Sequence, residues 1–165
     1  MSTLVDALAR CSFSELSARF ATGRRLRAAD LVGQRFLGRS LGHGALVERL
    51  TWQTFRKEID DNGDGINVML PQMWHRPSRP ERRHMPFVLT ETDDGAVIDY
   101  RPTHRVPHPL GLAVDPLRRV DDGAGPMVLL GVTELWLGGM RLRTPTWFAL
   151  TPDDDIGSGA FRPLA

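Results

Sequence analysis

The sequence is poor in cysteine: Cys11 is the only one among 165 residues. A lone cysteine can form neither an internal disulfide nor a cysteine-based metal site. We expect Cys11 to serve as a small buried hydrophobic residue.

Long hydrophobic runs are also lacking. The longest, such as Met127 to Val132, are far shorter than the roughly 20 residues needed to cross a bilayer. The start, Met1 to Ser12, contains Asp6 and Arg10 and lacks the basic-then-apolar order of a secretion signal. We therefore expect a cytoplasmic protein without a membrane partner.

An excess of charge of one sign is absent, because 21 basic residues face 20 acidic ones and the net charge is +1. This balance does not favour nucleic acid as a partner. Two local arginine clusters, one in the range 24–27 and one in the range 76–83, are interpreted first as solvated loops. Lys57 is the only lysine, and the preference for arginine indicates a GC-rich coding genome.

Known catalytic and metal-binding signatures are missing as well. The sequence contains no serine nucleophile elbow and no P-loop, and its five histidines lack ligand spacing. The range Asp60 to Gly65 matches the first half of a calcium loop, but Pro71 stands where the bidentate glutamate is needed, so a hairpin turn is expected. We expect no cofactor and no metal, and any chemistry should be acid–base or binding-driven.

One short amphipathic helix is predicted near the start of the chain. Ser12 and Glu15 fit a capping box, Leu16 and Phe20 follow at helical spacing, and Gly23 ends the run. The apolar stripe needs a partner, and we expect it to pack on the outside or the mouth of the domain that follows.

From Leu31 onward, short apolar stretches alternate with turn residues, which is typical of an all-β domain. Turns rich in aspartate, asparagine and glycine separate the stretches and favour hairpins. The predicted strands are Gly33 to Leu41, Thr51 to Ile59, Ile66 to Trp74, Met85 to Glu91, Ala96 to Arg101, Leu112 to Val120, Met127 to Leu135 and Met140 to Leu150.

About eight strands joined mainly by hairpins favour a closed antiparallel barrel preceded by short helices, because closure removes exposed strand edges. A β-sandwich and an α+β cone remain alternatives. We expect one domain over residues 1–150, with helices in 1–30, and a tail over 151–165. A barrel of this size holds packed side chains or one small ligand.

The stretch "LVGQRFLGRSLG", with Gly33, Phe36 and Gly38, and the stretch "AVDPLRRVDDG" before two closing strands ending in "WFAL" suggest a family. Together they resemble the GXWXG-type domains of the calycin, or lipocalin-like, group, although Phe36 stands in place of the tryptophan and lies three residues after Gly33 instead of two. The resemblance implies an eight-stranded barrel that holds an apolar ligand or a cofactor in its cup. It implies no catalytic residues.

Strand alternation provides candidate catalytic residues. In the strand Ala96 to Arg101, the apolar phase contains Ala96, Ile98 and Tyr100, so Tyr100 should point inward as a proton donor. Glu134 shares a phase with apolar residues and is the preferred carboxylate, expected to accept a hydrogen bond from Tyr100. His104 is a further candidate.

Large apolar side chains provide candidate ligand contacts. Indole rings bury a large area, and thioethers adapt to irregular guests, so either core packing or a ligand wall can explain them. The candidate contacts are Trp52, Met69, Met73, Trp74, Phe87 and Trp136. Alternation in the last strand places Leu142, Phe148 and Leu150 inward and Trp147 outward.

Three functions remain open from the sequence. The first is binding of a small hydrophobic molecule inside the barrel. The second is a cofactor-independent isomerase or cyclase that uses Tyr100, Glu134 and His104. The third is a protein interaction module, and the sequence leaves the oligomeric state open.

Overall fold

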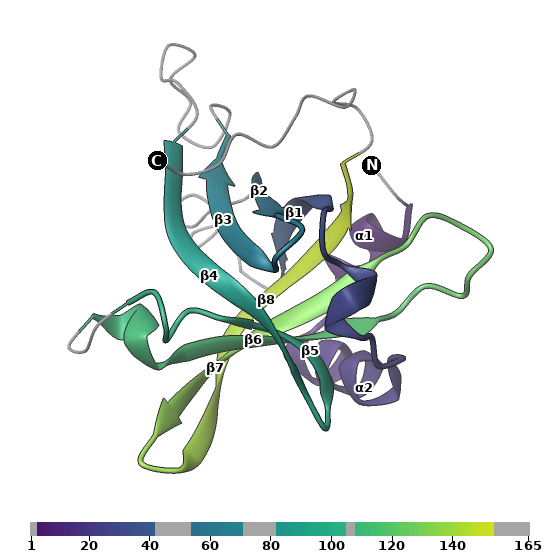
Figure 1. The fold of residues 1–165 in the computed structure, drawn as a ribbon. Helices are drawn as coiled ribbons and strands as arrows, with labels where there is room; N and C mark the ends of the chain where they lie inside the picture. Colours follow the sequence, from purple (N-terminus) through teal and green to yellow (C-terminus); the bar gives the residue numbers. More distant parts are fainter. Residues whose placement is uncertain (1–2, 42–53, 71–81, 105–107, 154–165) are drawn as a thin grey trace.

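The computed structural model describes residues 3–41, 54–70, 82–104 and 108–153 (Figure 1). Near its start are two short α-helices, α1 (Thr3–Leu8) and α2 (Phe13–Thr22). Single 3-10 turns, η1 (Ala28–Asp30) and η3 (Pro109–Leu112), lie before the first strand and before β6. No helix of the described ranges is long and apolar enough to cross a membrane.

Eight strands form a closed antiparallel barrel in which each strand pairs with its sequence neighbours and β1 also pairs with β8. The predicted barrel is thus confirmed. The strands are β1 (Arg35–Leu41), β2 (Thr54–Ile59), β3 (Asp64–Met69), β4 (Arg82–Thr92), β5 (Gly95–Asp99), β6 (Ala113–Arg119), β7 (Leu129–Leu137) and β8 (Met140–Pro152).

The barrel interior is lined by one face of each strand, because successive side chains of a strand point to opposite sides. Ala96, Ile98 and Tyr100 of the β5 segment belong to this interior cluster, so their predicted inward phase is confirmed. Phe148 and Leu150 also point inward, as predicted.

One end of the barrel is covered by the segment between α2 and β1. Leu26 and Leu31 from this segment are buried in the interior cluster. The backbone carbonyl of Leu26 accepts a hydrogen bond from the Ala96 N–H at 2.8 Å, which ties the segment to β5. The segment therefore acts as a plug at the end where the β4–β5 turn lies.

The N-terminal helices pack on the outer face of the barrel, over β7 and β8. Ser12 and Glu15 form the predicted capping box at the start of α2. Phe20 of α2 meets Trp147 of β8 edge-to-face, with ring centroids 5.8 Å apart. Trp147 therefore points outward, as predicted, and the helices cover this part of the barrel wall.

The β2–β3 connection is a tight hairpin turn, as predicted. Asp60 Oδ1 accepts hydrogen bonds from the backbone N–H groups of Asn62 and Asp64, both at 2.9 Å. Gly63 has a φ of 85°, a value that glycine adopts without strain. The carboxylate of the calcium-like sequence is thus used to hold the turn.

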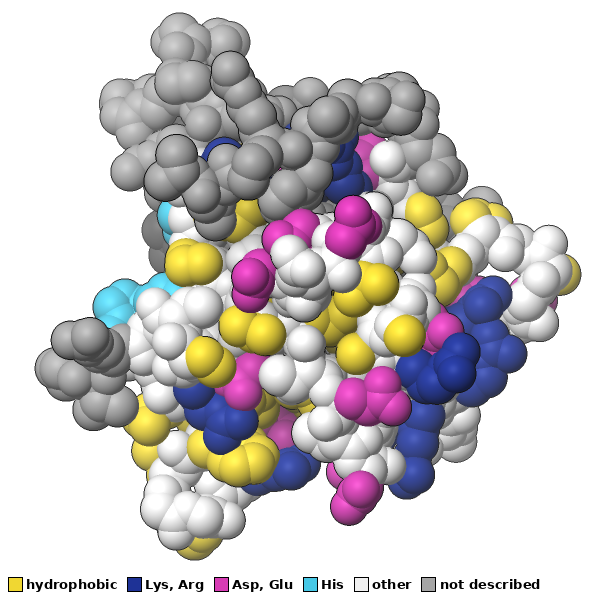
Figure 2. Space-filling model, in the orientation of Figure 1, with side chains coloured by type: hydrophobic (Ala, Val, Ile, Leu, Met, Phe, Trp, Pro, Cys, Tyr) yellow, Lys and Arg dark blue, Asp and Glu magenta, His cyan; other side chains and the backbone are white. Residues whose placement is uncertain are grey.

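The β7–β8 hairpin extends beyond the barrel wall (Figure 1). Leu142 was predicted to point inward, but it is 56% exposed on this extension. Strand alternation does not predict burial for Leu142, because this part of the hairpin lies beyond the barrel and neither of its faces points into the core. Figure 2 shows acidic and basic side chains interspersed on one face of the molecule, in keeping with the near-zero net charge.

Candidate functional site

The only lysine of the chain lies inside the barrel. Lys57 of β2 is 2% exposed, and its neighbours Phe55 and Ile59, on the same face of the strand, belong to the interior cluster. The Lys57 Nζ donates hydrogen bonds to Asn67 Oδ1 at 2.8 Å and to the Tyr100 hydroxyl at 2.6 Å. An amine charge is thus enclosed by the barrel.

A carboxylate completes the cluster. The Tyr100 hydroxyl donates to Asp115 Oδ2 at 3.2 Å, and Lys57 Nζ lies 3.8 Å from the same oxygen. The other oxygen, Asp115 Oδ1, accepts a hydrogen bond from Thr133 Oγ1 at 2.8 Å. The network therefore joins β2, β3, the end of β5, β6 and β7. We call its five members the polar cluster: Lys57, Asn67, Tyr100, Asp115 and Thr133.

Asn67 faces this cluster because it pairs with Lys57 across β2 and β3, and a β-bulge in β4 lies beside it. The β3–β4 register shifts between Ile66 and Asn67. Across the bulge, Met85 adopts a φ of 55°, and its carbonyl accepts a hydrogen bond from Asn67 Nδ2 at 2.9 Å. A left-handed methionine is strained backbone, which persists only where the surroundings hold it and which is common near functional sites.

Four aromatic rings surround the lysine amine. The Lys57 Nζ lies 5.4, 5.0, 5.3 and 5.3 Å from the ring centroids of Phe55, Phe87, Tyr100 and Phe148. These distances suit cation–π attraction, which strengthens where water is excluded. The rings leave the ammonium group in an apolar cage with three polar neighbours.

Glycines make room for three of these rings. Phe55, Phe87 and Phe148 each lie opposite a glycine of the neighbouring strand. A Cβ on that glycine would come within 2.2 Å of the facing ring in the case of Gly38 and Gly131, and within 2.1 Å in the case of Gly65. Strand glycines often mark such close approach, and here the same pairing is repeated three times around the barrel.

Burial shifts the pKa values of all three titratable groups in the cluster. Desolvation lowers the pKa of Lys57 to about 8, although the Asp115 charge opposes the shift. Desolvation raises the pKa of Asp115, opposed by Lys57, and raises the pKa of Tyr100 well above its ordinary value, reinforced by Asp115. In each of these groups burial favours the uncharged form, because the interior solvates a charge poorly.

These shifts define what the cluster can do chemically. An amine with a pKa of about 8 is neutral in roughly a tenth of molecules at pH 7 and can act as a base or a nucleophile. Tyr100 remains a neutral phenol that donates a hydrogen bond, and Asp115 can exchange a proton through it. Such displaced pKa values are typical of acid–base sites.

Glu134 does not take part in this cluster. It was expected to face inward and accept a hydrogen bond from Tyr100, but its carboxylate pairs with Arg143 at 3.0 Å and Tyr100 pairs with Asp115. Glu134 lies on the face of β7 opposite to Thr133, because side chains alternate along the strand. The interior carboxylate is therefore Asp115.

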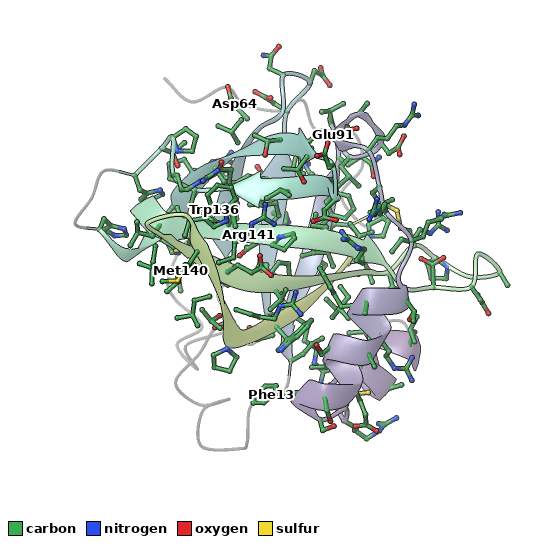
Figure 3. The ribbon with its side chains drawn as sticks, turned by 90° about the horizontal axis from the view of Figure 1, so that it is seen from below. Phe13, Asp64, Glu91, Trp136, Met140 and Arg141 are labelled. Carbon is green, nitrogen blue, oxygen red and sulfur yellow. The ribbon has the colours of Figure 1, made fainter. Side chains whose placement is uncertain are left out.

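Trp136 also lies on the outer face. The guanidinium carbons of Arg101 and Arg141 lie 4.0 and 4.7 Å from its ring centroid, and Figure 3 shows Trp136 and Arg141 close together. With Glu134, these residues line a shallow hollow of about 30 Å³ whose other walls are Thr90, Thr92, Val97, Val114 and Pro116. The strand residues that line this hollow alternate with those that point into the barrel. Trp136 therefore does not line the barrel interior.

The other proposed contact residues divide into two groups. Phe87 is 1% exposed inside the barrel, and Met69 of β3 is buried beside Phe55, its cross-strand partner. Trp52, Met73 and Trp74 lie outside the described residues.

His104 lies at the end of the barrel where β5 leads into the connection to β6. Its ring is 6.3 Å from that of Tyr100 and is stacked on His108 at 5.0 Å. His104 Nδ1 lies within hydrogen-bond distance of the Tyr100 carbonyl oxygen, at 3.1 Å. The histidine therefore neighbours the Tyr100 backbone, and no hydrogen bond links its ring to the phenol.

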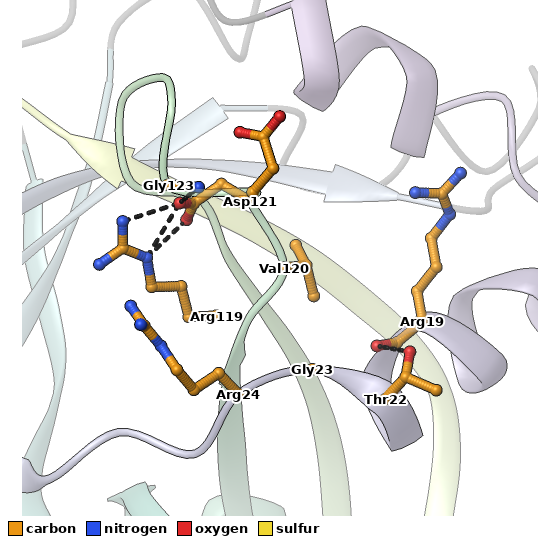
Figure 4. A pocket seen from close by; sticks show the side chains of 9 residues that line it. Arg19, Thr22, Gly23, Arg24, Arg119, Val120, Asp121 and Gly123 are labelled. Atoms are coloured by element: carbon orange, nitrogen blue, oxygen red, sulfur yellow. Dashed lines mark hydrogen bonds and ion pairs between the residues drawn. The ribbon is translucent and has the colours of Figure 1, made fainter.

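A larger hollow of about 310 Å³ lies outside the barrel, between the end of α2 and the β6–β7 turn (Figure 4). Arg119 lines it but is paired with Asp121 at 2.7 Å. That arginine lowers the pKa of Asp121 to about 2. The arginine in this hollow is therefore held by Asp121. In the described ranges, no three histidine, cysteine or carboxylate side chains gather as a metal site.

The sequence held signals for the residues that were missed. Asp115 shares a strand phase with Ala113 and Leu117, both of which are buried in the interior cluster. Lys57 is the only lysine of the chain and shares a strand phase with Phe55 and Ile59, which is a sequence signal for an inward position. Applying alternation to every strand would have found both.

The fold and the site together define a closed eight-stranded antiparallel barrel with a buried lysine–tyrosine–aspartate cluster at its centre. Comparison with models of known protein families, with curated proteins and with solved structures gives no match.

Proposed function

We propose that the barrel binds a small, mainly apolar molecule that carries one neutral oxygen function, and that it does so as a calycin-like carrier or sensor. The observation that supports this proposal is the buried Lys57 inside a cage of aromatic rings. Removing two charges from water costs several kcal/mol for each ion. An apolar core would serve stability better, so function is the better explanation for the cluster.

The charges of the cluster favour a neutral ligand group. Lys57 and Asp115 offset each other, so the interior offers no net charge to an ionic guest. A carbonyl or hydroxyl oxygen can accept the Lys57 hydrogen bond that now ends on Asn67 or Tyr100. The phenylalanine rings and Met69 suit an apolar body.

Prodan, a neutral naphthalene ketone whose emission shifts to shorter wavelengths in apolar surroundings, tests the proposal. Titration into the full chain should give a saturable blue shift that naphthalenemethanol reverses. Lys57→Met should weaken Prodan binding about tenfold, the value of one hydrogen bond from a charged donor. Arg143→Met, which removes a cation from the outer face, is the matched control and should leave the affinity unchanged.

Two outcomes would contradict the proposal. One is a blue shift that does not saturate, which indicates nonspecific adsorption. The other is equal affinity in the wild type and the Lys57→Met variant when both melt cooperatively.

A cofactor-independent isomerase or cyclase is a second candidate, favoured by the contact of Tyr100 with both Lys57 and Asp115. In this version Tyr100 and Asp115 replace the Tyr100–Glu134 pair expected from the sequence. Native mass spectrometry of freshly purified protein would detect a retained molecule. Its conversion by the wild type, but not by Tyr100→Phe, would favour the enzyme, and its unchanged recovery from both would favour the carrier.

A further inference from the structure

The identity of residue 57 is informative because every other basic side chain of the chain, apart from histidine, is arginine. Arginine suits buried ion pairs and stacking on aromatic rings better than lysine does. Elsewhere in this chain arginine does contact an aromatic ring: the guanidinium groups of Arg101 and Arg141 lie over the ring of Trp136. A primary amine at position 57 therefore offers something that a guanidinium does not, which is a nucleophilic nitrogen.

We propose that the Lys57 amine forms a reversible imine with an aldehyde or ketone bound in the barrel interior. This inference rests on the proposed function and specifies the oxygen group of the ligand as a carbonyl. It applies both to a carrier that holds its ligand covalently and to an enzyme that activates a carbonyl compound.

The geometry provides each group that the reaction needs. The neutral Lys57 nitrogen attacks the carbonyl carbon through its lone pair, the carbonyl oxygen takes up a proton from the Tyr100 hydroxyl, 2.6 Å from Nζ, and the nitrogen releases one proton to the Asp115 carboxylate, 3.8 Å away. Asp115 passes that proton on to Tyr100, so both residues are regenerated and a neutral carbinolamine results. The carbinolamine hydroxyl then takes up one proton from the solvent and leaves as water while the nitrogen lone pair forms the carbon–nitrogen double bond, which gives a protonated imine. No oxidant or reductant is required.

The cluster also suits the product. A protonated imine carries the same single positive charge as the lysine ammonium and retains one N–H donor. Asp115, 3.8 Å from Nζ, balances that charge, and the four aromatic rings stabilise it by cation–π attraction. Because Lys57 is only 2% exposed, bulk water has little access to the imine carbon, which slows hydrolysis back to the amine.

The ionisation of the amine supports the same chemistry. Burial brings the pKa of Lys57 down to about 8, so the nucleophilic form is far more populated near neutral pH than in an exposed lysine with a pKa of 10.5.

Reductive trapping tests the proposal directly, because the chain has only one lysine. The full chain is incubated with naphthaldehyde and sodium cyanoborohydride, and adducts are located by intact mass and peptide mapping. We expect a single saturable adduct on Lys57, slowed by an excess of naphthalenemethanol, which has the same ring system but no carbonyl. The rate should rise with pH with a midpoint near 8.

Lys57→Arg is the matched variant, because it keeps the positive charge but lacks the primary amine. It should lose the internal adduct and keep only slow labelling of the N-terminal amine. The cooperative melting of this variant should be checked in parallel, and the pH midpoint of the wild type provides an independent readout if the variant does not fold.

The outcomes separate this inference from the proposed function. If naphthalenemethanol displaces Prodan from the barrel but naphthaldehyde labels only the N-terminus, the imine is wrong and ligand binding stands. If Prodan gives no saturable shift and Lys57 is labelled no faster than the N-terminal amine, both proposals are overturned. A Lys57 adduct with a midpoint near 10.5 contradicts the proposal as well, because it indicates an ordinary exposed amine.

Discussion

The inner and outer faces of the barrel wall each carry an ion pair, and the surroundings of the two pairs differ. On the inner face, Lys57 and Asp115 are both nearly inaccessible to water, and aromatic rings surround the Lys57 amine. On the outer face, Glu134 pairs with Arg143, whose side chain is 43% exposed. Both pairs join one cation to one carboxylate, and in the inner pair burial lowers the pKa of Lys57 and raises the pKa of Asp115.

The role of a carboxylate in this barrel depends on the face of the strand from which its side chain points. Thr133 and Glu134 are neighbours in β7, but Thr133 donates to the interior Asp115 while Glu134 meets the external arginine. In the outer pair Glu134 is only 8% exposed, but Arg143 is 43% exposed and keeps its contact with water, which screens the pair in part and lowers its contribution to stability. The inner pair is unscreened, and removing one member leaves the other without compensation.

The largest difference between the faces should appear in the free energy of unfolding. Asp115→Ala should lower it by about 3 kcal/mol, because Lys57 and Tyr100 lose a buried partner. Glu134→Ala should lower it by about 1 kcal/mol or less, since Arg143 can turn to water. Urea unfolding at pH 7 measures both values. Equal losses for the two variants would contradict the contrast between the faces.

The pH dependence of stability gives the next effect. The pKa of Lys57 is about 8 in the folded protein and 10.5 when exposed, so the unfolded chain binds more protons between these values. Stability therefore rises with pH through this window, by about 2 kcal/mol from pH 8 to pH 10. Above pH 10 the raised pKa of Tyr100 opposes the rise, because only the unfolded chain then ionises its tyrosine.

Lys57→Met removes the group responsible and should abolish most of this rise. Urea unfolding at several pH values, with Arg143→Met as the control variant, checks the result. A stability that is flat from pH 8 to pH 10 in the wild type would show that the amine is not desolvated.

Much of the fold was predictable because strand alternation and turn residues are local signals. The stretch from Ala96 to Tyr100 shows this, since its apolar phase and the preceding glycine fixed both the strand and its inward face. Leu142 shows the limit. Alternation states which residues share a face but cannot state that a hairpin extends past the barrel, where no interior exists.

The site was only partly predictable because its members come from five strands, and contacts between distant strands depend on register. Tyr100 was found through its own strand, but its partner was assigned to Glu134. β7 is apolar on both faces, since the outer face is covered by helices, so its phase was ambiguous. The contact between Asn67 and Lys57 depends on the β2–β3 register, which alternation within a single strand does not give.

A smaller effect concerns the influence of Asp115 on the amine. Asp115→Asn removes the negative charge that raises the pKa of Lys57, so this pKa should fall by about one unit. Because the chain has a single lysine, carbon-13 lysine labelling gives one ε-carbon signal whose shift can be followed against pH. Glu134→Gln is the matched control on the outer face and should leave the titration unchanged. A rise in the Lys57 pKa in Asp115→Asn would contradict the ion pair.

The smallest effect is expected at Trp136, and it distinguishes the outer hollow from the barrel interior. Trp136 is held between Arg101 and Arg141 outside the barrel, so Trp136→Ala should leave the affinity for Prodan within experimental error. Phe87→Leu, which removes an aromatic ring 5.0 Å from the Lys57 amine, should weaken that affinity severalfold. Stability should respond in both variants, because each loses ring contacts, with about 0.5 kcal/mol per lost cation–π pair at the exposed site. Fluorescence titration and urea unfolding of the two variants measure the affinity and the stability separately. If Trp136→Ala weakens Prodan binding and Phe87→Leu does not, the ligand sits in the outer hollow, and the buried lysine serves the fold alone.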